Sequence, residues 1–184
     1  MDTIWWVVIA VAAIIVVALV FWSLMQSRRR AGLREHYGPE YDRTVGSVGS
    51  RRKAERELTE REKARESLDI RPLSEAARNR YSDDWQRAEK RFVDDPELAA
   101  READSIVKSV LQERGYPSDD FAAQAAAVSV DHPQLVQRYR HGHEMVHSNG
   151  ADAEQRTENL RQAMIDFRTV VEELLEPERE PAAH

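Results

Sequence analysis

Residues His143 to His147 have the pattern H-E-x-x-H, the one segment of this chain that looks catalytic. On a helix, histidines four positions apart share a face, and both imidazoles can bind the same zinc ion. The glutamate between them, Glu144, could then activate a zinc-bound water as a general base. The pattern therefore indicates a zinc-dependent hydrolase as one interpretation of the chain.

The sequence does not supply the third protein ligand that a catalytic zinc site needs. Glu172 or Glu173 could complete the site only if the helix that carries them packs back against the helix of His143. Asn149-Gly150 also ends that helix directly after His147, where metalloproteases usually continue it with apolar residues. Zinc binding therefore stays an alternative on the sequence alone.

A structural interpretation explains the two histidines without a metal, and it is the one we prefer from the sequence. His143 lies beside the apolar face of its predicted helix and would pack at the edge of the core. His147, in the last turn, would interact favourably with the negative end of the helix dipole. We therefore predict no catalytic residue, no metal and no cofactor. The alternative is Zn²⁺ on His143 and His147, with Glu144 as the base.

The rest of the sequence offers no second catalytic pattern. It contains no glycine-rich phosphate loop, no G-x-S-x-G and no EF-hand loop. Cysteine is absent, which excludes disulfides and thiol chemistry. The function is therefore expected to depend on binding rather than on a reaction.

The elements that position these residues begin with an apolar segment. Ile4 to Met25 contains no ionisable side chain, and about 20 apolar residues are enough to cross a bilayer as a helix. Trp5 and Trp6 at one end and Trp22 near the other are placed like the aromatic belts of membrane proteins. The segment predicts an uncleaved, single-pass transmembrane helix.

Positive charge follows this segment at once, in Arg28, Arg29, Arg30 and Arg34. Because positive residues near a membrane span stay cytoplasmic, we expect the N-terminus outside and the remaining chain in the cytoplasm, at the cell membrane. The same arginines can pair with anionic lipid headgroups, each contributing about 1 kcal/mol. Membrane lipids are therefore one predicted partner.

Two further segments separate the predicted anchor from the rest. Residues 31–46 are interpreted as a turn segment broken at Gly38-Pro39, and Gly46 to Ser50 as a flexible break. Residues 51–68 alternate in charge, with few apolar positions, which predicts a solvated helical spacer. A self-associating coiled coil is the alternative for this segment, although it lacks a sustained heptad pattern.

The remaining chain carries apolar residues at three- and four-residue spacing in five stretches, which predicts five helices and no sheet. The fold class is therefore all-α: a transmembrane helix, a charged helical spacer and a small five-helix bundle. The predicted helix starts are Ser74, Asp95, Ser118, Asp131 with Gln134 as a capping box, and Thr157; Gly115 and Asn149-Gly150 are predicted ends. The predicted division is 1–27 anchor, 28–70 juxtamembrane segment and spacer, 71–176 helical domain and 177–184 disordered tail.

Charge excludes one class of partner. The chain has a formal net charge of −6, and residues 70–184 contain 15 Lys or Arg against 23 Asp or Glu. Because phosphate neutralisation dominates nucleic-acid binding, this acidic domain is not expected to bind nucleic acid. A protein partner or self-association is expected instead.

Six stretches after the apolar segment resemble one family. They are residues 37–45 (YGPEYDRTV), 68–73 (LDIRPL), 91–96 (RFVDDP), 114–117 (RGYP), 130–133 (VDHP) and 160–164 (LRQAM). In these stretches the chain resembles a family of uncharacterised bacterial proteins, common in actinobacteria. The resemblance implies a membrane-anchored, mostly helical protein, and it carries no activity and no site residue.

These observations favour a membrane-tethered interaction or scaffold protein with no catalytic activity. A zinc-dependent hydrolase that uses the His143–His147 segment is the first alternative, and a self-associating coiled-coil membrane protein is the second.

Overall fold

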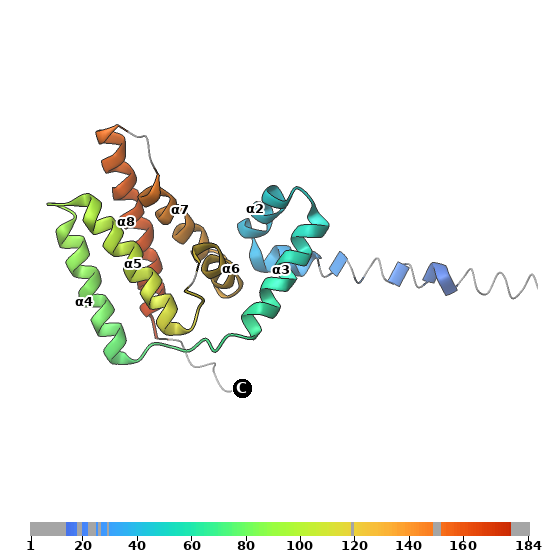
Figure 1. Cartoon of the computed structure of the whole chain (residues 1–184). Coiled ribbons are helices and arrows are strands. Elements are labelled where there is room, and N and C mark those ends of the chain that lie inside the picture. Colours follow the sequence, from blue (N-terminus) through green and yellow to red (C-terminus); the bar gives the residue numbers. More distant parts are fainter. Residues whose placement is uncertain are drawn as a thin grey trace, which may run out of the picture. The chain divides into compact units, whose positions relative to one another are not determined.

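The structure is a computed structural model that describes residues 14–17, 20–21, 25, 27–28, 30–118, 120–148 and 152–177. Every regular element in these ranges is a helix, which confirms the all-α class for this part of the chain (Figure 1). The chain divides into two compact units, Met1–Leu58 and Thr59–His184, and each is described by itself.

The predicted transmembrane helix is corrected by the structure. None of the helices in the described ranges combines the length and the apolar character that a bilayer crossing requires. A crossing takes about 20 successive apolar residues, whereas α8 (Ala153–Leu175), with 23 residues, mixes apolar with charged side chains. Most of Ile4–Met25, including Trp5, Trp6 and Trp22, lies outside the described residues.

The unit that ends at Leu58 is helical where a turn segment was predicted. Residues 30–37 are helical, and α2 (Pro39–Val48) follows after a single-residue break at Gly38, which has a φ of 48°. The break at Gly38-Pro39 was therefore placed correctly, but the interpretation of residues 31–46 as turns was wrong. Proline tolerates the first helical position because the N–H that it lacks would be unpaired there.

The second break is shorter than predicted. α2 continues through Gly46 to Val48, and Gly49 ends it in the left-handed conformation with a φ of 70°. α3 (Arg51–Glu66) begins two residues later. Three of its residues, Ala54, Glu55 and Leu58, are buried, so α3 confirms the predicted helix but not a helix solvated on all sides.

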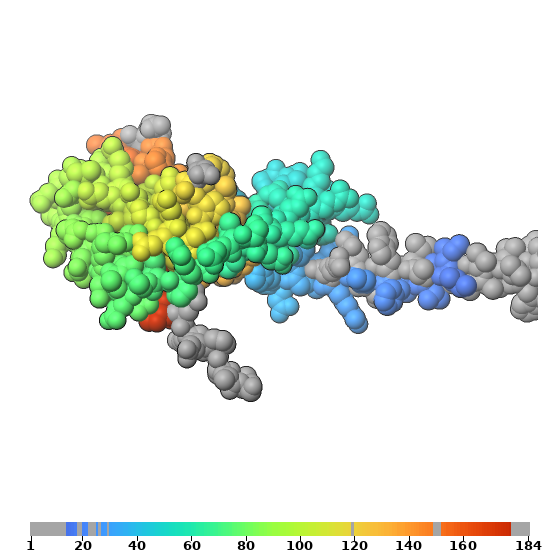
Figure 2. All heavy atoms as spheres, turned by 60° about the horizontal axis from the view of Figure 1, so that its bottom comes forward, coloured from blue at the N-terminus to red at the C-terminus, as the bar shows by residue number. Residues whose placement is uncertain are grey.

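Besides the end of α3, the described part of the unit that begins at Thr59 contains five helices, and all five were predicted. They are α4 (Glu75–Arg91), α5 (Pro96–Arg114), α6 (Phe121–Asp131), α7 (Leu135–His147) and α8. α7 packs most extensively against α8, while α5 contacts α4, α7 and α8. In the space-filling view the atoms of α4 and α5 form one continuous surface (Figure 2). The buried core lies between these helices and includes Trp85, Val107, Tyr139, Leu160 and Phe167.

Two of the predicted helix starts are confirmed. The Ser74 hydroxyl accepts a hydrogen bond from the Ala77 backbone N–H, and the Asp95 carboxylate accepts one from Leu98. Each side chain therefore satisfies an otherwise unpaired N–H of the first turn. The predicted end at Gly115 is confirmed as well.

Three predicted starts are wrong, and in two of these helices another residue provides the cap. Asp120 caps α6 instead of Ser118, and Asp152 caps α8 instead of Thr157, whose hydroxyl donates to the Ala153 carbonyl oxygen. The carboxylate of Asp131 does not cap α7, because it accepts hydrogen bonds from other helices and segments. Its donors are Arg65 and the Tyr116 hydroxyl.

Two glycines let segments approach closely in this unit. At Gly115, with a φ of 102°, an added Cβ would lie 2.3 Å from the Asp69 carbonyl oxygen. At Gly142 in α7, a Cβ would lie 2.8 Å from the Phe167 ring of α8. Glycine at position 142 therefore sets the spacing of α7 and α8 directly beside His143.

Candidate functional site

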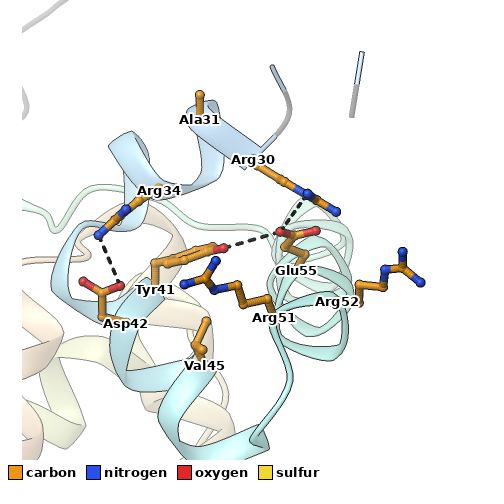
Figure 3. A pocket seen from close by; sticks show the side chains of 9 residues that line it. All are labelled: Arg30, Ala31, Arg34, Tyr41, Asp42, Val45, Arg51, Arg52 and Glu55. Atoms are coloured by element: carbon orange, nitrogen blue, oxygen red, sulfur yellow. Dashed lines mark hydrogen bonds and ion pairs between the residues drawn. The ribbon is translucent and has the colours of Figure 1, made fainter. Parts of the chain in front are cut away.

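A groove of about 670 Å³ lies in the unit that ends at Leu58, between residues 30–37, α2 and the start of α3. Four of its nine lining residues are arginines and two are acids (Figure 3). The lining residues are Arg30, Ala31, Arg34, Tyr41, Asp42, Val45, Arg51, Arg52 and Glu55. We call this feature the arginine groove.

Two of the four arginines in this groove are already paired. Arg30 Nε lies 3.2 Å from Glu55 Oε1, and Arg34 Nη2 lies 3.8 Å from Asp42 Oδ1. The Tyr41 hydroxyl donates to Glu55 Oε1 at 3.4 Å, and burial, followed by the charge of Glu55, raises the pKa of Tyr41. Both acids of the groove therefore have a cationic partner.

The other two arginines, Arg51 and Arg52, differ from this pair. Among the residues described, neither Arg51 nor Arg52 forms an ion pair with a carboxylate, and both side chains are exposed. They also begin α3, whose first turn contains no acidic residue. The positive end of the helix dipole thus adds to their charge, so this side of the groove attracts anions.

The H-E-x-x-H segment lies on α7 and meets a carboxylate from another helix. His143 Nδ1 is 3.0 Å from Oδ1 of Asp104 on α5, and His147 Nε2 is 3.4 Å from Asp104 Oδ2. Within the described ranges these three side chains form a group that could hold a metal ion. We call it the Asp104 cluster.

The neighbours of this cluster hold one of its imidazoles in place. Phe121 stacks on His143 with ring centroids 3.7 Å apart, and it also contacts Tyr139. Burial, together with the negative charge of Asp104, raises the pKa of Tyr139. The predicted packing of His143 at the edge of the core therefore agrees with the structure, but its Nδ1 faces the Asp104 carboxylate, which was not predicted from the sequence.

The two ligands considered from the sequence do not belong to this cluster. Glu173 instead lies 3.2 Å from His132 Nδ1, and Glu172 is not part of the metal-capable group. Glu144 is exposed on α7 and is also outside the group. The cluster therefore contains three ligand-capable side chains without the predicted base.

The residues predicted to position the chain at a membrane fall into two sets. Arg30 and Arg34 line the arginine groove, and Arg28 is helical and exposed. Arg29 lies outside the described residues, as do the three tryptophans named above. Arg51 and Arg52 were missed because the alternating charge of residues 51–68 was interpreted as a solvated face.

Comparisons of the chain with protein-family profiles, with curated proteins and with solved structures find no match. The resemblance to a family of bacterial proteins stays a prediction.

Proposed function

We propose that the unit ending at Leu58 binds the phosphate groups of anionic lipids at a membrane surface, and that the chain acts as an interaction module. One observation carries this proposal: Arg51 and Arg52 line a groove and have no carboxylate partner among the residues described. A guanidinium presents planar N–H donors that match the oxygens of a phosphate group.

Apolar residues earlier in the same unit favour a lipid surface over other anionic partners. Ile14 and Phe21 each expose 68% of their surface, and Val17 exposes 67%. Exposed apolar side chains of this size, followed in the chain by basic residues, are typical of segments that lie against a membrane interface.

The unit that begins at Thr59 is proposed to contact a protein partner, and its net-acidic composition supports a partner with basic residues. The alternative of zinc-dependent hydrolysis has less support, since Glu144 is exposed and outside the Asp104 cluster. Self-association through α3 also has less support, because three of its residues are already buried in the single chain.

Binding of the full chain to vesicles tests this proposal. Partitioning is measured on phosphatidylcholine vesicles and on vesicles that also contain phosphatidylglycerol. In the double variant Arg51→Gln/Arg52→Gln, the preference for anionic vesicles should fall about thirtyfold, which corresponds to about 2 kcal/mol of binding free energy. Inorganic phosphate, titrated separately at constant ionic strength, distinguishes a lipid site from a site for free phosphate.

A matched control keeps the total charge change the same. Arg87→Gln/Arg161→Gln removes two exposed arginines of the other unit, which pair with Asp84 and Glu158. This control should retain the preference for anionic vesicles. Equal loss in both double variants would show that net charge alone is responsible, and the proposal would be wrong.

A further inference from the structure

We propose that Asp104, His143 and His147 form a zinc site that fastens α7 to α5. Each residue offers one ligand atom, and these atoms all lie within 4.8 Å of one another. The cluster belongs to the unit that begins at Thr59, whereas the proposed lipid contacts involve only residues up to Leu58. The zinc proposal therefore does not depend on the lipid-binding proposal, and each can be tested without the other.

The separations in the cluster are close to those of a zinc site. Bonds of about 2.0–2.2 Å in tetrahedral geometry place ligand atoms about 3.3 Å apart. In the structure, His143 Nδ1 lies 3.0 Å from Asp104 Oδ1, and His147 Nε2 lies 3.4 Å from the other oxygen, Asp104 Oδ2. The carboxylate of Asp104 therefore lies about one zinc-ligand separation from each imidazole, and all three ligand atoms are within 4.8 Å of one another.

Two features of the fold hold the ligands in this arrangement. His143 and His147 are one helical turn apart on α7, and α5 packs against α7, which brings Asp104 opposite them. The Phe121 ring, stacked on His143, restricts rotation of that imidazole. Because the ligands lie on packed helices and one imidazole is held by a stacked ring, they lose little conformational freedom when an ion binds.

The donor atoms and their exposure indicate which ion fits. Two imidazole nitrogens and one carboxylate oxygen suit Zn²⁺, whereas Mg²⁺ and Ca²⁺ prefer oxygen ligands throughout. The Asp104 side chain exposes 16% of its surface and that of His147 exposes 56%. Asp104 is thus mostly covered by protein, whereas His147 faces solvent. On that side, water can supply the fourth ligand of the ion.

Without a metal, the same atoms can form two hydrogen bonds between imidazole N–H groups and the carboxylate. When zinc binds, each neutral ring takes the tautomer that carries its proton on the other nitrogen, so the nitrogen that faces Asp104 binds the ion instead. The metal then links residue 104 of α5 to residues 143 and 147 of α7 and stabilises the folded state. This role does not require Glu144.

Titration of the chelator-treated full chain with zinc chloride tests the proposal. Calorimetry should give one Zn²⁺ per chain, and thermal unfolding should shift to higher temperature with zinc. His147→Ala removes one ligand, and the affinity should fall by more than about a hundredfold, since even residues behind a ligand contribute ten- to a hundredfold. Because the His147 side chain is more than half exposed, this variant should fold without metal.

Two control variants separate the site from general binding by surface histidines. His141→Ala removes a histidine of the same helix that instead pairs with Asp166, at 2.6 Å. Glu144→Gln removes the predicted base. Both should bind one Zn²⁺ with unchanged affinity.

Asp104→Asn provides a second ligand variant, and it should also lose more than about a hundredfold in affinity. The proposal would be overturned if the chelated chain bound no zinc. It would also be overturned if His147→Ala and Asp104→Asn bound zinc as tightly as the unsubstituted chain, or if His141→Ala lost as much affinity as they do.

Discussion

Arg156 and Arg51 have the same type of side chain in two different environments: that of Arg156 is bonded within the protein, and that of Arg51 is exposed in a groove. Arg156, in the unit that begins at Thr59, forms two bonds to the Glu97 carboxylate, at 2.6 and 2.9 Å. It also donates to the backbone carbonyl oxygens of Met145, Val146 and Ser148, at the end of α7. Arg51, at the start of α3, lines an open groove without a carboxylate partner among the described residues.

The contrast separates arginines that maintain the fold from those available to a ligand. The donors of Arg156 are occupied, and they join the start of α5, the end of α7 and the first turns of α8. Arg51 is exposed and has no carboxylate partner among the described residues, so its donors can bind a group from outside the chain. We therefore expect substitutions in the first set to change stability and those in the groove to change binding.

The largest expected effect on the free energy of unfolding comes from the hydrophobic core of the unit that contains Arg156. Trp85 on α4 is 7% exposed and lies in this core. Trp85→Ala should lower the free energy of unfolding by about 3–5 kcal/mol, because it removes a large buried side chain and leaves a cavity. Urea unfolding followed by circular dichroism measures this change. Val93→Ala, at an exposed position, should change stability by less than about 0.5 kcal/mol.

The next effect tests the comparison itself. Arg156→Gln should cost about 2–3 kcal/mol, because charge-assisted bonds to Glu97 and to three carbonyl groups are lost together. Arg51→Gln should change the free energy of unfolding by less than about 0.5 kcal/mol, as is usual for exposed positions without such contacts. The same urea measurement applies to both. Similar costs for the two variants would contradict the distinction between structural and ligand-binding arginines.

A smaller effect is expected at the start of α8, close to Arg156. Asp152→Ala should cost about 1 kcal/mol, since its carboxylate caps the Gln155 backbone N–H at 2.8 Å. Thr157→Ala should cost only a few tenths of a kcal/mol, because this residue lies inside the helix and is exposed. Thermal unfolding of the two variants compares them directly. A larger loss in Thr157→Ala would mean that α8 starts where the sequence analysis placed it.

The smallest effect is a dependence on pH that comes from the Arg156 pair. The bonds to Arg156 lower the pKa of Glu97 from 4.5 to about 2. Since the folded-state value is lower than the unfolded value, the pair stabilises fully above pH 4.5, and this contribution is lost as the pH falls toward about 2. The contribution of the pair to the free energy of unfolding should remain below about 1 kcal/mol, because the Glu97 side chain is 39% exposed and solvent screens the charges.

Unfolding free energies measured across this pH range reveal the contribution of Glu97. The difference between the unsubstituted chain and Glu97→Gln should shrink as the pH falls, because the neutral glutamine does not titrate. A difference that stays constant down to pH 2 would show that Glu97 does not titrate in this interval.

The five helices from α4 to α8 were predictable because their signals are local. Apolar residues three and four positions apart form one face within a single helix, and Ser74, Asp95 and Gly115 act on the backbone of their own turn. The starts of α6 and α8 were misplaced because more than one capping residue lies within reach. In the structure, Asp120 rather than Ser118 caps α6, and Asp152 rather than Thr157 caps α8. The sequence alone does not show which of two nearby capping residues starts the helix.

The sequence by itself determined the helical class, the five helices of the second unit and the shared face of His143 and His147. Only the tertiary structure decided what those histidines meet. Asp104 precedes His143 by 39 residues, and no spacing rule relates positions on two different helices. The packing of α5 against α7 brings them together, just as the arrangement of residues 30–37, α2 and α3 gathers four arginines into one groove. Helical periodicity is a property of neighbouring residues, whereas a site depends on which helix faces are buried against one another.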